Sequence, residues 1–146
     1  MHIHKRMVFI RFIALLLAMA MVAPTGVQAA GITPRASSYL DSYNAYIYLP
    51  GDGEVQVYFR VEGTSTMDEL GALTIMIYES INGSTYSWKK TFSHDTTPGL
   101  LSYNDDYHSG CVSYSGVEGR SYKAYICVWG GKNGEGDSRY FWAYPA

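Results

Sequence analysis

Apolar and polar side chains alternate through most of the sequence, and this alternation constrains the fold more than any other feature. The clearest example is Glu54–Glu62, where Val55, Val57, Phe59 and Val61 are separated by polar or tyrosine side chains. Residues two apart point to the same face of a strand, so this segment predicts a strand with one buried face in an antiparallel sheet. No segment shows the period of a convincing amphipathic helix.

Turn signals divide the alternating segments at intervals of 8–12 residues, which is typical of a β-sandwich or barrel. We expect an all-β, antiparallel β-sandwich of seven to eight strands. The expected strands are residues 38–49, 54–62, 72–79, 86–92, 100–103, 107–115, 120–129 and 138–144. Asn82-Gly83 predicts a two-residue hairpin turn, and Thr66 with Glu69 predicts a capped helical turn at 67–70. Residues 130–137 predict a glycine-rich loop.

The N-terminal residues have the order of a secretory signal. Met1–Arg11 carries three basic residues and no acid, and Phe12–Ala23 is an apolar run of twelve residues. A membrane anchor, the alternative interpretation, would need about 20 apolar residues. Val27-Gln28-Ala29 supplies the small residues of a cleavage site. We therefore expect a signal peptide at 1–29, a single β-sandwich domain at 30–146, and a secreted, extracellular product without stable membrane insertion.

The charge of the exported part limits its partners. Residues 30–146 keep eight of the eleven Lys and Arg and all thirteen Asp and Glu, which gives a formal net charge of −5. An acidic surface disfavours nucleic acid and anionic lipid. We expect no nucleic-acid partner.

The two cysteines predict one disulfide, because both lie in the exported part and an oxidising compartment favours pairing. If segments 107–115 and 120–129 form a hairpin with Cys111 opposite Cys127, polar residues pair with polar and apolar with apolar. Opposed residues lie ~4.5–5.5 Å apart at Cα, which suits a disulfide. Such a bridge, closing a loop of about 15 residues, is worth ~3 kcal/mol. The alternative is two free thiols.

Acidic residues and histidines near the middle of the chain invite a catalytic interpretation. His94-Asp95 and Asp105-Asp106-x-His108 are the segments concerned. Asp is common in loops because its side chain hydrogen-bonds the nearby backbone, so we expect no catalytic residues, no cofactor and no metal. A calcium site at Asp105 and Asp106 is the alternative for these carboxylates.

Tyrosine is the unusual component of the composition. All fourteen tyrosines lie after residue 29, together with three Trp and three Phe. Tyr58, Tyr78 and Tyr125 fall on strand faces expected to point outward. Exposed tyrosine offers a rigid ring with a polar tip, so these three form the candidate binding surface for a protein or glycan at the cell surface. The alternative is that the aromatic residues only stabilise the sheet.

Segment 122–128 resembles the penultimate strand of immunoglobulin-like and fibronectin-like sandwiches. The strand begins at Tyr122, alternates through Val128, and leads through glycines to the last strand. The resemblance implies an immunoglobulin-like sandwich. The inter-sheet cysteine pair of antibody domains is absent, because the two cysteines are expected on neighbouring strands.

Two bacterial groups are also similar in sequence. Ser38-Tyr39-Leu40, the 63–71 segment and the 134–140 segment resemble small exported proteins of Gram-positive bacteria, a group with no assigned activity. His108-Ser109-x-x-Val112, Ala124 and the aromatic end Tyr140-Phe141-Trp142 resemble the β-sandwich lactococcin-type bacteriocins. That second resemblance implies a toxin that interferes with cell-wall synthesis in related bacteria. The cysteine pair and the long N-terminal half depart from it.

The sequence therefore favours a secreted, non-enzymatic β-sandwich that binds a partner outside the cell. A bacteriocin-like toxin or immunity factor acting at the cell envelope is the alternative, and an enzyme of unrecognised type is a third hypothesis.

A first prediction concerns processing. When the full chain is expressed in a secreting Gram-positive host, the product released into the medium should begin at Ala30, because cleavage is expected after Ala29; cleavage after Ala30 is the alternative. N-terminal sequencing of that product checks the boundary. A product that stays in the membrane fraction with residue 1 intact would contradict it.

Overall fold

The computed structural model describes residues 37–146, and the expected signal peptide at 1–29 lies outside them. The described residues form six strands: β1 (Leu40–Gly51), β2 (Glu54–Ser80), β3 (Ser87–Ser93), β4 (Leu101–Ser115), β5 (Ser121–Lys132) and β6 (Glu135–Ala143). Within this part of the chain, no helix has the length and apolarity to span a membrane.

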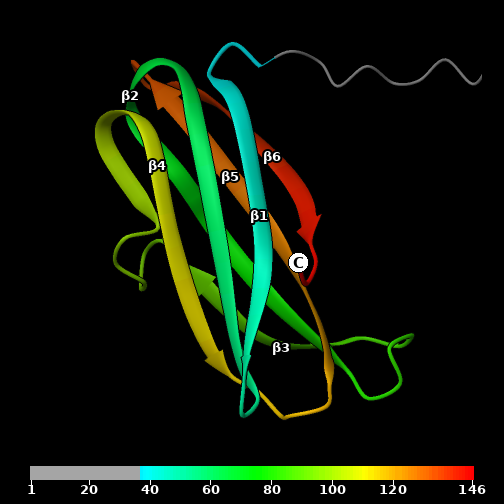
Figure 1. Ribbon diagram of the computed structural model, residues 1–146. Coiled ribbons are helices and arrows are strands. Elements are labelled where there is room, and N and C mark those ends of the chain that lie inside the picture. Colours follow the sequence, from blue (N-terminus) through cyan, green and yellow to red (C-terminus); the bar gives the residue numbers. More distant parts are fainter. Residues whose placement is uncertain (1–36) are drawn as a thin grey trace, which may run out of the picture. The chain divides into compact units, whose positions relative to one another are not determined.

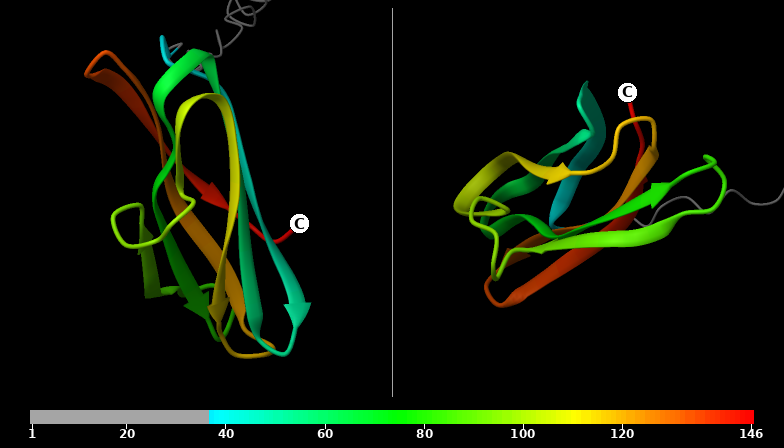
Figure 2. Two further views of the ribbon diagram at one scale, coloured as in Figure 1. Left: turned by 90° about the vertical axis from the view of Figure 1, so that its left-hand side faces the viewer. Right: turned by 90° about the horizontal axis from the view of Figure 1, so that it is seen from below.

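β2 is the central strand of the fold. Its first half pairs with β1 on one side and β4 on the other, and its second half pairs with β5 and β3. β6 pairs with β5, and all of these strand pairs are antiparallel. The result is one antiparallel sheet of six strands that curls into a half-barrel, with β1 and β4 in front of β5 and β6 in Figure 1, and Figure 2 gives two further views of the curl.

A bulge at residues 63–66 divides β2 into its two halves. Glu62 lies opposite Tyr107 and Met67 lies opposite Asp105, so four residues of β2 face the single residue Asp106 of β4. Such a bulge bends the strand that carries it. Gly63 permits the bend, because a side chain there would collide with Met67 and with the Ser65 carbonyl.

The core lies on the inner side of the curl. The alternating residues Val55, Val57, Phe59 and Val61 of β2 are all at most 3% exposed, as the alternation predicted. They pack with buried residues elsewhere in the fold, of which Met67, Leu70, Ile75 and Ile77 belong to β2 itself and Ile47, Leu100, Val112, Ala124, Ile126 and Val128 lie outside it. The C-terminal residues attach to β1 by backbone hydrogen bonds. Ile47 N–H donates to the Tyr144 carbonyl at 3.0 Å, and Ala146 N–H donates to the Ile47 carbonyl at 3.1 Å.

The strand boundaries differ from the prediction in three places. Residues 67–70 continue β2 and form no helical turn. Segments 100–103 and 107–115 belong to one strand, β4, because Asn104 takes a positive φ of 55° and the strand continues past it. The glycine-rich segment 130–137 is a tight hairpin whose turn residues Asn133 and Gly134 have φ values of 55° and 79°, as a two-residue turn of the type I′ kind requires. The count is therefore six strands where seven to eight were expected.

The loop at Asn82-Gly83 is longer than a two-residue turn. The Asn82 side-chain oxygen accepts hydrogen bonds from the backbone N–H groups of Ser84 and Thr85, each at 3.0 Å. This stabilises an open loop from Ile81 to Tyr86. Trp88 therefore lies opposite Tyr78 and is exposed. A two-residue turn at Asn82-Gly83 would instead pair Trp88 with Ile77 on the core face, so that expectation is wrong.

The expected disulfide between Cys111 and Cys127 is wrong, because both cysteines are free. β4 and β5 do not form a hairpin with each other. Cys111 lies opposite Tyr58 of β2, whereas Cys127 lies opposite Thr74 of β2 and Tyr140 of β6. Residues 116–120 carry the chain from one half of the sheet to the other, so the two thiols belong to different halves.

A buried carboxylate fixes this crossing. Glu79 is 6% exposed, and its Oε2 accepts a hydrogen bond of 2.8 Å from the Tyr122 hydroxyl. Its Oε1 lies 3.2 Å from the Lys89 ammonium and 3.7 Å from the Arg120 guanidinium. The Tyr122 hydroxyl also accepts a hydrogen bond from the Val117 N–H at 2.7 Å. The network thus ties the end of β2 to β3, to the crossing segment and to β5.

Free thiols give a direct test of the crossing. Alkylation of the native protein should modify Cys111, which is exposed, and should spare Cys127, which is buried until the protein is denatured. Desolvation raises the pKa of the Cys111 thiol, so its labelling rate should increase with pH over a higher pH range than that of an unshifted cysteine. Intact mass after iodoacetamide treatment, with and without denaturant, measures both reactions. An intact mass lower by two hydrogens, with no labelling in denaturant, would show that Cys111 and Cys127 form a disulfide and would contradict the structure.

The Glu79 network predicts how stability depends on pH. Burial by itself raises the pKa of the Glu79 carboxyl, but the hydrogen bonds and positive charges around it outweigh burial and leave the pKa below its ordinary value. The contribution of the ionised Glu79 carboxylate to the free energy of unfolding is therefore full when the pH is above the pKa of Glu in the unfolded chain, about 4.3. That contribution is lost as the pH falls through the lower pKa of Glu79 in the native protein. Glu79→Gln should lower the free energy of unfolding by about 2 kcal/mol at pH 7 and flatten this acid dependence.

Urea denaturation of the native protein and of Glu79→Gln between pH 2.5 and 7 measures this effect. Glu135→Gln, at an exposed carboxylate, is the matched control and should change stability little. Equal acid sensitivity of Glu79→Gln and the native protein would contradict the assignment.

Candidate functional site

A contiguous aromatic surface covers the outward side of β3, the second half of β2, β5 and β6. Cross-strand pairing builds it, because Tyr78 lies opposite Trp88 and Lys123, and Tyr125 lies opposite Trp142. We call this surface the aromatic face. It consists of Tyr78, Tyr86, Trp88, Lys123, Tyr125, Tyr140 and Trp142.

The rings of the aromatic face contact one another. Trp142 is the centre, with its ring centroid 4.8 Å from that of Tyr125 and 5.3 Å from that of Tyr78. Tyr125 continues the row to Tyr140 at 5.8 Å. Aromatic pairs at such separations add stabilisation beyond their buried area, so the side chains are held in place before any partner arrives.

Lys123 is the positively charged residue of the aromatic face. Its ammonium nitrogen is 4.1 Å from the Trp142 ring centroid and 4.5 Å from that of Tyr86. These are cation–π distances. Through these two contacts Lys123 links Tyr86, in the loop before β3, to Trp142 in the last strand. They hold the Trp142 ring in addition to its contacts with Tyr78 and Tyr125.

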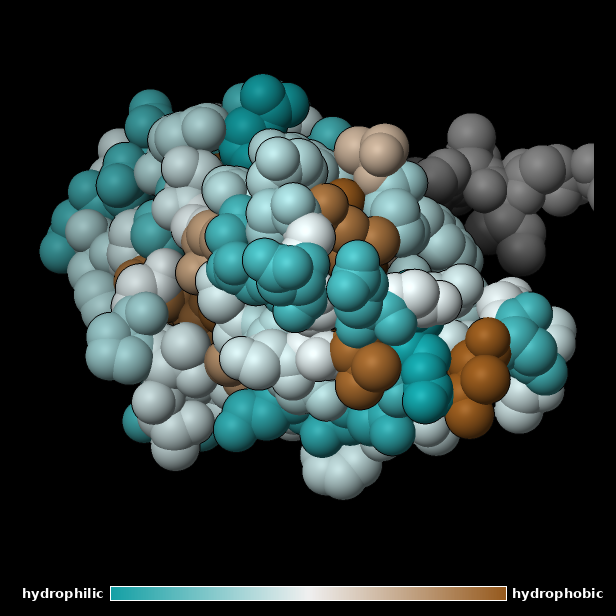
Figure 3. All heavy atoms as spheres, turned by 60° about the horizontal axis from the view of Figure 1, so that its bottom comes forward, coloured by the Kyte–Doolittle hydropathy of each residue, from teal (hydrophilic) through white to brown (hydrophobic). Residues whose placement is uncertain are grey.

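The exposed fractions differ across the aromatic face. Trp88 and Tyr140 are 58% and 59% exposed and Trp142 is 38% exposed, whereas Tyr78 and Tyr125 are half-buried between their neighbours. The outer rings therefore offer contact area and the inner ones support them. On the side of the molecule shown in Figure 3, the most hydrophobic side chains form small separate patches among hydrophilic residues.

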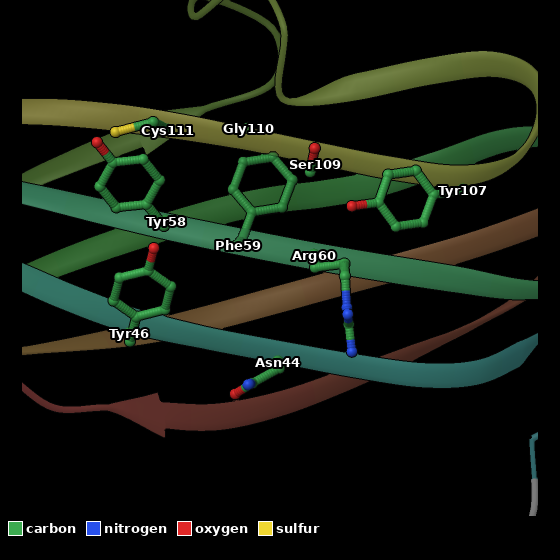
Figure 4. Close-up of a pocket in the computed structure, with 9 residues that line it drawn as sticks. All are labelled: Asn44, Tyr46, Tyr58, Phe59, Arg60, Tyr107, Ser109, Gly110 and Cys111. Atoms are coloured by element: carbon green, nitrogen blue, oxygen red, sulfur yellow. The ribbon is translucent and has the colours of Figure 1, made fainter. Parts of the chain in front are cut away.

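A groove lies on the outward side of the other half of the sheet, across β1, β2 and β4. Two cross-strand rows form its floor: Tyr46, Tyr58 and Cys111 in one, and Asn44, Arg60 and Ser109 in the next. Its volume is about 490 Å³, and Phe59, Tyr107 and Gly110 complete its lining. Figure 4 shows these side chains along the three strands.

The groove combines stacked rings with polar groups. The Tyr46 and Tyr58 rings are nearly parallel, with an interplanar angle of 10° and centroids 5.2 Å apart. Tyr58 donates a hydrogen bond to the Gln56 side-chain oxygen at 2.9 Å, which fixes its hydroxyl. Arg60 is the charged residue among the nine that line the groove.

The structure separates the three tyrosines predicted to form one binding surface. Tyr78 and Tyr125 lie together on the aromatic face, where both contact Trp142. Tyr58 points outward as expected, but it lies in the groove on the other half of the sheet. The alternation gave the faces of Tyr58, Tyr78 and Tyr125 correctly, but it did not indicate which strands are neighbours.

The acids and histidines considered as a catalytic or metal site make separate local contacts. His94 lies 3.6 Å from Asp95, and both belong to the loop after β3. His108 instead hydrogen-bonds the Gly99 carbonyl at 2.8 Å and packs on Phe59. Asp105 accepts backbone N–H bonds from Asp106 and Tyr107. Within residues 37–146, no three His, Cys, Asp or Glu side chains are grouped to hold a metal ion.

Comparison with known proteins gives one distant structural neighbour. No protein family model and no curated protein sequence matches the chain. The crystal structure of Spo0M, a sporulation control protein from Bacillus subtilis, aligns with a TM-score of 0.41 and 13% sequence identity. The alignment covers 72% of this chain and 49% of Spo0M, so the chain spans about half the length of that protein. The exported Gram-positive proteins and the bacteriocins that the sequence resembles find no support in these comparisons.

Proposed function

We propose that the protein is a secreted, non-enzymatic binding module that attaches to a glycan or protein at the cell surface through its aromatic face. The observation that carries the proposal is the row of mutually contacting rings, Tyr78, Trp142, Tyr125 and Tyr140, on a solvent-facing sheet. The order of residues 1–29 supports export, since a basic start, a short apolar run and small residues follow one another.

Rigidity of the aromatic face favours binding. Tyrosine and tryptophan give large contact areas for few rotatable bonds, and rings already packed against each other lose little further freedom when a partner docks. The hydroxyls of the tyrosines and the Trp142 indole add polar groups at the ring edges. Such a surface suits sugar rings, which present C–H groups on their faces and hydroxyls at their edges, as well as the side chains of a protein.

A binding test with cell walls follows from this proposal. The purified protein lacking residues 1–29 should sediment with insoluble cell walls of Gram-positive bacteria. Trp142→Ala and Tyr140→Ala should each weaken binding by about tenfold or more, because a few Trp and Tyr side chains supply most of the binding energy of an interface. Periodate oxidation of the walls should abolish binding if the partner is a glycan, and protease treatment should do so if it is a protein.

The matched control is Tyr103→Ala, which removes an aromatic side chain that is 64% exposed on β4, away from the aromatic face. It should leave binding unchanged. Thermal melting of each variant shows whether the fold is retained. Failure of the native protein to bind walls, or equal loss in Tyr103→Ala, would overturn the proposal.

A further inference from the structure

We propose that the groove formed by β1, β2 and β4 is a separate binding site for a short acidic sugar, with Arg60 holding the carboxylate. The groove lies on the opposite half of the sheet from the aromatic face and shares no residue with it. The inference therefore does not depend on what the aromatic face binds.

Charge gives the first argument. Arg60 is the one charged side chain among the nine residues that line the groove, and the exported part as a whole is acidic. The ion pair of Arg60 with Glu62 joins Nε to Oε1 at 3.8 Å, and the Arg60 side chain is 53% exposed. Exposed pairs of this length are weak. A carboxylate brought in by a ligand can bind the planar guanidinium in two-pronged geometry and compete with Glu62.

The groups around Arg60 give the second argument. Tyr46 and Tyr58 stack beside it on one side and Tyr107, which is 46% exposed, lies on the other. Asn44 and Ser109 occupy the same cross-strand row as Arg60 and offer amide and hydroxyl groups. A sugar ring presents C–H groups on its faces and hydroxyls at its edge, so aromatic walls with polar groups between them match it.

Backbone pairing argues against an extended peptide as the occupant. Arg60 lies opposite Asn44 on one side and Ser109 on the other, and Tyr58 lies opposite Tyr46 and Cys111. The middle strand of the groove is therefore paired along both edges, and a peptide cannot be added to it as a further strand. A ligand on the floor of the groove is therefore recognised by side chains.

The acidity of the protein limits the ligand to a short one. A densely charged polyanion would be repelled by the net charge of −5 carried by residues 30–146. A single carboxylate directed at Arg60 avoids most of that repulsion. The volume of about 490 Å³ is within the range that holds one small ligand.

The test uses one sugar with a single carboxylate in two forms, galacturonic acid and its methyl ester, titrated into the purified protein by calorimetry at low salt. The acid should bind at least about tenfold more tightly than the ester, because a charge-assisted hydrogen bond is lost on esterification. Arg60→Gln should remove this preference and Arg60→Lys should restore part of it. Tyr46→Ala should weaken the binding of both forms.

Lys132→Gln is the matched control, since it removes an exposed positive charge outside the groove, and it should leave the preference intact. Trp142→Ala should also leave it intact, which separates this site from the aromatic face. Equal affinity for acid and ester, no binding of the acid, or a preference that persists in Arg60→Gln would each overturn the proposal. Binding of short peptides with a free C-terminal carboxylate in place of the sugar acid would overturn it as well.

Discussion

The whole fold depends on the pairing of β2 along both of its edges. This strand of 27 residues contacts four of the other five strands, and only β6 is attached through β5. Its inward side chains supply much of the core in both halves, from Val55 to Ile77. The bulge at 63–66 bends β2 so that its two halves run in different directions, because four residues there face one residue of β4. Both candidate surfaces are the outward sides of this single strand and its neighbours.

The sequence predicted the faces of the strands well and their neighbours poorly. Alternation at Glu54–Glu62 and around Tyr78 and Tyr125 is a local property, so it identified inward and outward residues correctly. Strand pairing depends on contacts far apart in the chain. Cys111 matches Cys127 in polarity, but it matches Tyr58 equally well, and the alternation cannot distinguish the two partners. The disulfide was predicted from that ambiguity and was wrong.

The candidate site shows the same division. Tyr140 and Trp142 lie two apart in the last expected strand, so their common face was accessible from the sequence. Their contacts with Tyr125 could be recognised only once β6 was placed beside β5. Arg60 and Tyr46 were not identified as a pair of site residues for the same reason, since β1 had to be placed beside β2 first. The Glu79 network had no local signal, because its cations come from β3 and from the crossing at 116–120.

The sharing of one strand by both halves has a consequence for how the domain comes apart. Neither half retains a complete sheet without β2, so neither can persist as a separately folded fragment. Loss of register anywhere in β2 disturbs partners on both sides of the bulge at once. Heating or denaturant should therefore melt the molecule in a single transition, and a fluorescent probe in the groove and the tryptophans of the aromatic face should record the same midpoint.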